Sequence, residues 1–141
     1  MPVIHKSPLP DVVIDDISIT DYVLRKADKL ADKAAFIDGG SGRVITFGEL
    51  KDQIRRFAGG LKERGFSTGS TLALVAPNIP EYAVVFHGCG VAGGTVTTVN
   101  PTYGPEEIRF QLLDASASIL VTIEAAMPIA LEAIEGTDVE E

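Results

Sequence analysis

The sequence predicts an α/β fold, with a mainly parallel sheet that carries helices on both faces. From residue 46 onward, segments with helical periodicity alternate with short apolar or β-branched segments. Such alternation is typical of parallel strands joined by right-handed helical crossovers. One strand segment, 71–75, carries a continuous apolar run, as expected for a strand that is covered on both faces.

The first 17 residues predict an extended arm. Pro2, Pro8 and Pro10 each fix φ and remove a backbone donor. Beyond Ser18, apolar residues at positions 19, 23, 27 and 30 have helical spacing. We therefore divide the chain into an arm, 1–17, and an incomplete α/β unit, 18–141.

A strand at 34–37, a turn at 38–42 and a returning strand at 43–46 are expected next, followed by the clearest helix of the sequence. Thr46 and Glu49 form a T-x-x-E capping box at its start. Gly65 suits a left-handed cap at its end, with Phe66 as the hydrophobic contact beyond it. The apolar stripe of this helix consists of Phe47, Leu50, Ile54, Phe57, Ala58 and Leu61.

Three strands, at 71–75, 95–99 and 119–123, should be parallel neighbours, with that stripe packed on one face. Asn78 and Glu81 are expected to cap a helix from 81 to about 92. Pro105 suits the first position of a further helix, and a short helix is expected around 129–134.

The spacing of Gly88, Gly90 and Gly93 matches the G-x-G-x-x-G motif of dinucleotide-binding folds, with Asp114 as a candidate ribose ligand. The context favours another interpretation, because the residues that follow are strand-like and no helix opens there. We interpret the glycines as small residues that let the end of a helix lie close to the sheet. A dinucleotide-binding domain stays as an alternative.

Four other residues could carry chemistry. His87 could act as a base or a metal ligand, but no Ser, Asp or second His is arranged around it in the sequence, so we interpret it as structural. Cys89 has apolar neighbours and is expected to be a buried, inert thiol. Glu106 and Glu107 are interpreted as compensating a helix dipole. No P-loop, nucleophile elbow or H-E-x-x-H is present, so we expect no catalytic, cofactor-binding or metal-binding residue.

Composition excludes several classes of function. The formal charge of −8 argues against a nucleic-acid binder. No window approaches the roughly 18 apolar residues that span a bilayer, and no secretory signal is recognisable. The single cysteine, Cys89, excludes an internal disulfide and favours a cytoplasmic location. The acidic end from Glu124 onward is expected to be solvated.

Four segments together resemble a known family. They are SPLPDV at 7–12 with ISITDYV at 17–23, ITFGEL at 45–50, VAPNIPEY at 75–82, and VNPTY at 99–103 with PEEI at 105–108. In this order, they resemble the opening of 4-coumarate–CoA ligases, within the adenylate-forming acid–CoA ligases. The resemblance covers nearly the whole chain.

The resemblance implies an enzyme that uses ATP, Mg²⁺ and coenzyme A to convert a carboxylic acid into an acyl-adenylate and then a thioester. The family's phosphate loop ending in Lys, its Tyr-Gly-x-Thr-Glu segment, its ribose Asp and its C-terminal Lys do not occur here. Asn100, Pro101 and Tyr103 match a family segment that we interpret as structural.

We therefore expect an N-terminal fragment of a ligase that binds no cofactor and is inactive alone, with the missing remainder of the ligase as its partner. The small carboxylic acid, whether aryl, fatty or another kind, stays open. A non-catalytic interaction or scaffold protein derived from the same subdomain is the alternative.

Overall fold

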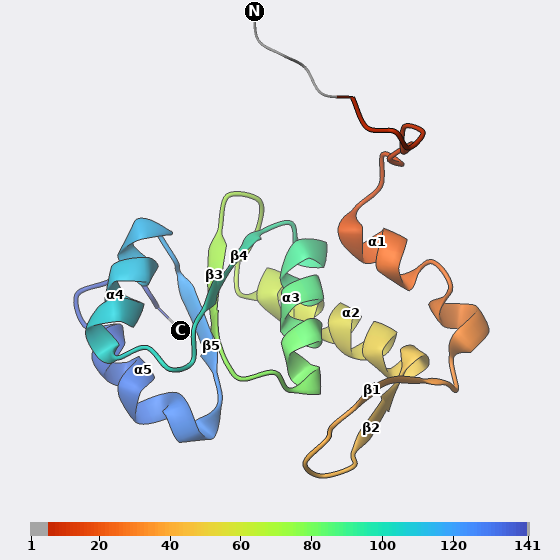
Figure 1. Ribbon diagram of the computed structural model, residues 1–141. Helices are drawn as coiled ribbons and strands as arrows, with labels where there is room; N and C mark the ends of the chain where they lie inside the picture. Colours follow the sequence, from red (N-terminus) through yellow and green to blue (C-terminus); the bar gives the residue numbers. More distant parts are fainter. Residues whose placement is uncertain (1–5, 141) are drawn as a thin grey trace, which may run out of the picture.

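Three parallel strands form the centre of the structure, and β3 lies between β4 and β5 (Figure 1). The computed structural model describes residues 6–140. The strands are β3 (Thr71–Val75), β4 (Thr95–Val99) and β5 (Ile119–Thr122). Both pairings are parallel, which confirms the predicted topology.

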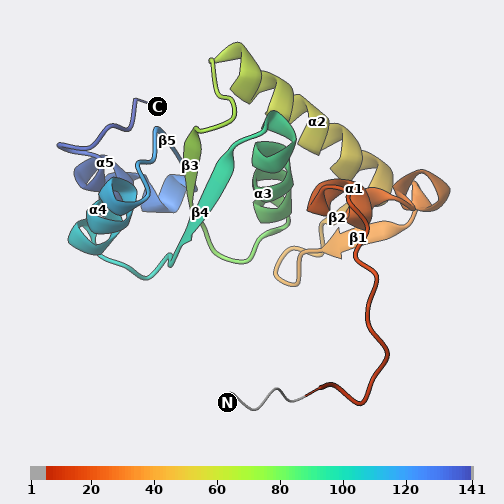
Figure 2. The ribbon, with the colours of Figure 1, turned by 90° about the horizontal axis from the view of Figure 1, so that it is seen from above.

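Helices cover both faces of this sheet, as predicted (Figure 2). Because side chains alternate along a strand, Leu72 and Leu74 point into one core and Ala73 and Val75 into another. The first core contains residues of α2 (Phe47–Glu63) and α3 (Pro80–Ala92), and the second contains residues of α4 (Pro105–Asp114) and α5 (Met127–Ala133). A short 3-10 helix, η2 (Glu124–Ala126), precedes α5.

Both predicted ends of α2 are confirmed. The Glu49 N–H donates to the Thr46 hydroxyl at 3.2 Å, and the Thr46 N–H donates to the Glu49 carboxylate at 2.8 Å. At the other end Gly65 has φ +83°, and the Phe66 N–H donates to the Leu61 carbonyl at 3.0 Å. This is the left-handed cap that Gly65 predicted.

The apolar stripe of α2 packs on the sheet along only part of its length. Ala58 and Leu61 belong to the core that contains Leu72 and Leu74. Leu50 and Ile54 instead form a separate cluster with residues of β2 (Val44–Thr46) and α3. A helix of 17 residues is about 25 Å long, whereas a strand of five residues spans about 17 Å. The helix therefore extends beyond the sheet.

The N-terminal region departs from the expected single helix. It forms α1 (Ile19–Leu24) and a separate 3-10 helix, η1 (Ala27–Leu30), because the backbone at Lys26 is not helical. Ser18 caps α1, but Ile19 and Val23 are exposed and only Ala27 of the predicted apolar set is buried. β1 (Ala34–Ile37) and β2 then form an antiparallel hairpin.

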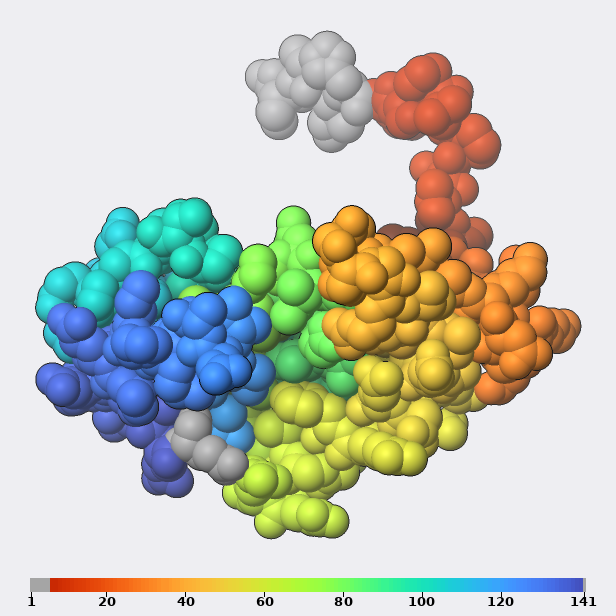
Figure 3. Space-filling view, turned by 90° about the horizontal axis from the view of Figure 1, so that it is seen from below, coloured from red at the N-terminus to blue at the C-terminus, as the bar shows by residue number. Residues whose placement is uncertain are grey.

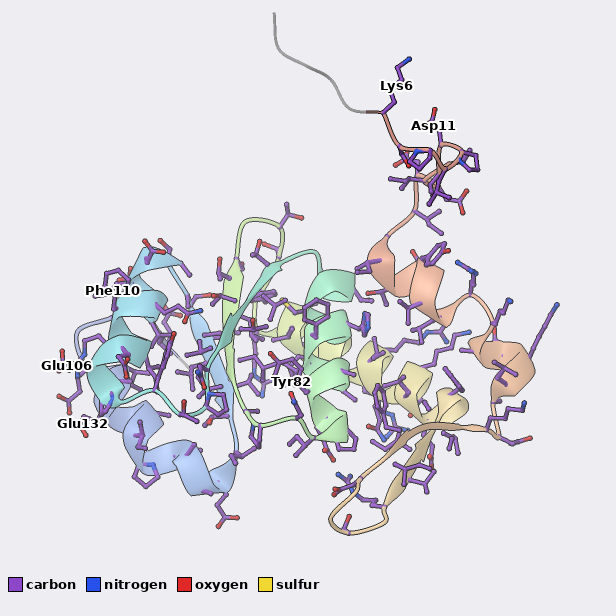
Figure 4. All side chains as sticks on the ribbon, in the orientation of Figure 1. Lys6, Asp11, Tyr82, Glu106, Phe110 and Glu132 are labelled. Carbon is purple, nitrogen blue, oxygen red and sulfur yellow. The ribbon has the colours of Figure 1, made fainter. Side chains whose placement is uncertain are left out.

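The predicted arm lies away from the body of the molecule, where Figure 4 labels Lys6 and Asp11. Residues 6–17 are exposed and contain no helix or strand, and the first part of the arm, 1–5, lies outside the described residues, as does 141. The division of the chain at residue 17 stays a prediction.

The predicted cap of α3 is wrong. This helix begins at Pro80, its N-cap is Ile79, and no side chain caps it. Proline at the first helical position only removes one of the N–H groups that a helix start leaves unpaired. Asn78 lies one residue before the N-cap, so its side chain is not at the position from which a residue caps a helix. Glu81 pairs instead with Arg43 of the hairpin loop.

Candidate functional site

In this fold, a ligand site is expected at the carboxyl ends of β3 and β4. After β3 the chain runs to α3 on one face of the sheet, and after β4 it runs to α4 on the other. In open α/β sheets, ligands bind where the crossovers diverge in this way. The two loops there, 76–79 and 100–104, lie in the segments that predicted the family.

The side chain of Asn100 forms hydrogen bonds within the turn that follows β4. Its side-chain oxygen accepts from the N–H and the hydroxyl of Thr102, at 3.0 and 2.9 Å. The Tyr103 N–H donates to the Asn100 carbonyl at 3.1 Å. The segment ends the strand and turns the chain, which agrees with its structural interpretation.

A hollow of about 390 Å³ lies beside the loop that follows β3. The β1–β2 hairpin forms one wall, and the first two turns of α3 form the other. Tyr82, labelled in Figure 4, is one of its aromatic side chains. The complete lining is Phe36, Ile37, Asp38, Gly39, Asn78, Ile79, Pro80, Tyr82, Ala83, Phe86 and His87.

The charged groups around this hollow are paired or hydrogen-bonded to one another, except that Oε2 of Glu81 is buried without a hydrogen-bond partner among the described residues. Hydrogen bonds from the Ser41 hydroxyl and the Gly40 N–H lower the pKa of Asp38. The hydrogen bond from Arg43 lowers the pKa of the Glu81 carboxyl, and the same contact raises the pKa of Arg43. The hollow thus presents aromatic walls and a carboxylate, without a nucleophile beside a base.

His87 faces a polar partner from a distant part of the chain. Its Nδ1 lies 3.0 Å from the hydroxyl oxygen of Thr20 on α1. Burial lowers the pKa of His87, so the ring is neutral at pH 7. No local pattern could have predicted this pair, because 67 positions separate the two residues.

The other residues singled out in the sequence have structural surroundings. Cys89 is fully buried and its thiol lies 3.3 Å from the Thr95 carbonyl oxygen; burial raises the pKa of the thiol to about 11. The Glu107 carboxylate accepts from the Gly104 N–H at 2.9 Å, which caps α4. Glu106 pairs with Arg109 at 2.8 Å.

The glycine motif does not have the geometry of a dinucleotide site. Gly88 and Gly90 lie inside α3, which ends at Ala92, and the next element is a strand. A Cβ at Gly88 would lie 2.7 Å from Cδ1 of Phe57 on α2. The glycine therefore lets two helices approach each other, and the expectation that it brings a helix end to the sheet is corrected. Asp114, at the end of α4, is exposed.

Residues 6–140 contain no cluster of metal ligands, because no three of their His, Cys, Asp or Glu side chains gather in a way that could hold an ion. None of the helices in this part of the chain is long and apolar enough to span a membrane.

Comparison with known proteins places these features in a family. The family described as "AMP-binding enzyme" matches residues 23–141. The chain is 38% identical to a 4-coumarate–CoA ligase from Pinus taeda, over 86% of this chain and 23% of the relative. It is 31% identical to a long-chain-fatty-acid–CoA ligase from Bacillus subtilis, over 91% of this chain and 22% of that protein.

Solved structures agree with the sequence comparison. A benzoate CoA ligase from Burkholderia xenovorans superposes with a TM-score of 0.80 and 27% identity, over 85% of this chain and 24% of the other. A long-chain-fatty-acid–CoA ligase from Archaeoglobus fulgidus superposes with a TM-score of 0.86 over 96% of this chain and 29% of the other; at 23% identity, it supports the fold alone.

The chain thus spans less than a quarter of the length of these two curated relatives. The match to the family nevertheless runs through every strand of the central sheet and every helix that covers it. The chain therefore belongs to the AMP-binding enzyme family, the adenylate-forming acid–CoA ligases.

Proposed function

We propose that this chain supplies the N-terminal α/β segment of an ATP-dependent acid–CoA ligase and does not form acyl-adenylate by itself. The observation that carries the proposal is the 38% identity to a 4-coumarate–CoA ligase of which the chain spans 23%. In the complete ligase, the carboxylate of the acid attacks the α-phosphorus of ATP and pyrophosphate leaves. The thiol of coenzyme A then attacks the acyl carbon and AMP leaves.

The charges of the chain support inactivity in isolation. Adenylyl transfer needs cations and preorganised donors around the phosphates. The loops at the carboxyl ends of β3 and β4, 76–79 and 100–104, contain no Lys or Arg, and the formal charge of the chain is −8. We therefore assign ATP, Mg²⁺ and coenzyme A to the complete ligase, with their binding groups outside this segment.

The acid remains to be identified by experiment. The relatives and solved neighbours include enzymes named for 4-coumarate, benzoate and long-chain fatty acids. An assay panel should therefore contain aryl and fatty acids. The cytoplasmic location expected from the single cysteine stays a prediction.

Acid-dependent exchange of labelled pyrophosphate into ATP tests the proposal. The purified chain should give no exchange above background with any acid of the panel. Exchange that survives purification, and that disappears in a Thr46→Ala/Asn100→Ala variant with a disrupted fold, would show that the chain is catalytic by itself.

A non-catalytic interaction protein is the second candidate. The strand β5 favours it, because it lies at the edge of the described sheet and has the largely apolar sequence ILVT. Adding the rest of a related ligase separates the two functions. Restored exchange supports the ligase segment, whereas binding without exchange supports the interaction protein.

A further inference from the structure

The helix α1 contacts α3 through one buried side chain. Thr20 is the only buried residue of α1, with 4% of its surface exposed. Its hydroxyl oxygen lies 3.0 Å from Nδ1 of His87 and 3.7 Å from the point that a Cβ at Gly90 would occupy. His87 and Gly90 are three positions apart, so they lie on the same face of α3. The Thr20 side chain therefore lies between them, where Gly90 leaves room for it.

The backbone that follows α1 can act as a hinge. Lys26 has φ −108° and ψ 1°, which lie outside the helical region, and it separates α1 from η1. η1 belongs to the body of the molecule, because Ala27 is buried and Asp28 forms an ion pair with Lys51 of α2. A change in the backbone at Lys26 would therefore move α1 and leave η1 in place.

The other contacts of α1 are weak. Residues 6–17, which precede it, are all exposed, and the arm, in red, stands clear of the body in the space-filling view (Figure 3). Leu24 adds an apolar contact with the cluster that contains Ile54, but it stays partly exposed. A helix of six residues is not stable by itself, so α1 depends on the packing of Thr20 and Leu24.

The His87 ring has no counter-ion that would favour its positive form. The ring lines the hollow beside the hairpin, and Thr20 lies against its Nδ1. Burial is the only cause that shifts the pKa of His87, and it lowers this pKa. None of the charged residues on the elements around the ring shifts it: Asp21 and Arg25 at α1, Asp38 and Arg43 in the hairpin, Glu49, Lys51, Asp52, Arg55, Arg56, Lys62 and Glu63 on α2, and Glu81 on α3.

Protonation changes what the ring can do at this contact. In a neutral imidazole one nitrogen is an acceptor, so Nδ1 can accept from the Thr20 hydroxyl. In the protonated ring both nitrogens are donors, and that hydrogen bond is lost. The new charge also lies beneath α1 without a counter-ion, which costs desolvation energy. Hydration of the ring after α1 moves away removes this cost.

We propose that Thr20 and His87 form a pH-sensitive latch. When the His87 ring takes up a proton, α1 turns at Lys26 and separates from α3 together with the arm, while the sheet, α2 and α3 stay folded. This inference goes beyond the proposed function and does not depend on it, because both residues of the latch lie within this chain.

The direction of the effect follows from linkage. In the released state His87 should have about its ordinary pKa of 6.5, whereas burial lowers its pKa in the latched state. The latched state therefore has its full advantage above about pH 6.5 and loses it as the pH falls through the latched pKa. Because one proton is bound, the ratio of released to latched molecules should rise at most about tenfold between pH 7.5 and roughly pH 5.5.

Hydrogen exchange followed by mass spectrometry tests the latch on the whole chain. Protection factors, which correct for the intrinsic pH dependence of exchange, are compared between α1 and β3. His5 is replaced by Gln in every sample, so that His87 is the only histidine. Protection of α1 should be at least about tenfold lower than that of β3, because α1 opens locally. It should fall by about two- to tenfold from pH 7.5 to roughly pH 5.5.

His87→Gln is the control for the proton. Glutamine keeps a polar side chain beside Thr20 but does not titrate, so the protection of α1 should not change between the two pH values. Protection of β3 in the same sample checks that the variant is folded.

Reciprocity gives a second measurement, because release of α1 must raise the pKa of His87 if protonation releases α1. Val23→Pro breaks α1 in its interior, and the pKa of the ring, followed by NMR, should rise towards 6.5. Ile19→Pro is the matched control, since Ile19 is also exposed and β-branched but is the first residue of α1, where proline is tolerated. Ser18 already has the extended backbone that suits a residue before proline, so here the pKa should stay low.

Three results would each overturn the latch. Equal protection of α1 and β3 would show that α1 opens only when the whole chain unfolds. A fall in α1 protection that is as large in His87→Gln as in the chain with His87 would show that another group is responsible. The same pKa of His87 in Val23→Pro and Ile19→Pro would show that the ring is protonated without release of α1.

Discussion

The hydroxyl oxygen of Thr20 lies 3.0 Å from Nδ1 of His87, and this contact attaches α1 to the middle of α3. Thr20 is the only buried residue among the described residues of the arm and α1. The apolar residues that would attach an amphipathic helix here, Ile19 and Val23, are exposed. A polar pair therefore positions this helix where the sequence predicted an apolar face.

Stability should fall when His87 becomes protonated. Burial lowers the pKa of His87 in the folded chain below the ordinary value of 6.5, so the unfolded chain binds more protons in this range. The free energy of unfolding should therefore be independent of His87 above about pH 6.5 and decrease as the pH falls from there through the folded pKa. Urea unfolding between pH 7.5 and roughly pH 5 measures this dependence.

A His87→Gln variant is the matched control for the pH series. Glutamine keeps a polar side chain beside Thr20 but does not titrate, so its stability should depend less on pH over the same interval. Identical pH dependence in the two proteins would show that His87 does not contribute. The carboxyls of Asp38 and Glu81 have lowered pKa values and should contribute only at lower pH.

Gly88→Ala should destabilise the chain by about 1–3 kcal/mol, because the added Cβ would lie 2.7 Å from Cδ1 of Phe57. Gly59→Ala is the matched control, since Gly59 lies inside α2 and a methyl group there would have no atom within 4 Å outside its own helix backbone and chain neighbours. That change should stabilise the chain by roughly 0.5–1 kcal/mol through helix propensity. Equal effects of the two substitutions in urea unfolding would contradict the tight α2–α3 contact.

Local patterns predicted the elements of this fold better than the contacts between them. The capping box at Thr46 and the left-handed cap at Gly65 involve neighbours within a few residues, so the sequence contains all the information they need. The Thr20–His87 pair and the packing of Gly88 on Phe57 depend on how whole helices cross. The way in which two helices cross depends on tertiary packing, and the spacing of apolar residues along the sequence does not predict it.

The contact that covers the edge of β4 could not be predicted from the sequence either. The β-branched segment of β4 and the apolar segment of β5 both predict strands. Only the fold shows that the side chain of Gln111 on α4 returns to bond the Thr98 carbonyl of β4. Resemblance to a family, not local chemistry, identified the function class.

The ion pair between Arg43 and Glu81 should contribute little to stability. It joins the hairpin loop to the first turn of α3, but the two side chains remain 49% and 42% exposed. Exposed pairs typically contribute about 0.2–1 kcal/mol. A double-mutant cycle with Arg43→Ala and Glu81→Ala, followed by urea unfolding, should give a coupling energy within that range; a value above about 2 kcal/mol would indicate a desolvated pair.

Cys89 should resist thiol reagents as long as the chain is folded. Its side chain is fully buried, and burial raises the pKa of the thiol to about 11. Because the thiolate is the reactive form, both access and ionisation oppose labelling at about pH 8. Iodoacetamide followed by mass spectrometry should detect little modification of the native chain and complete modification in denaturant. Since local opening would expose the thiol, a labelling rate close to that of a free cysteine would show that α3 separates from β3 and β4 in the native state.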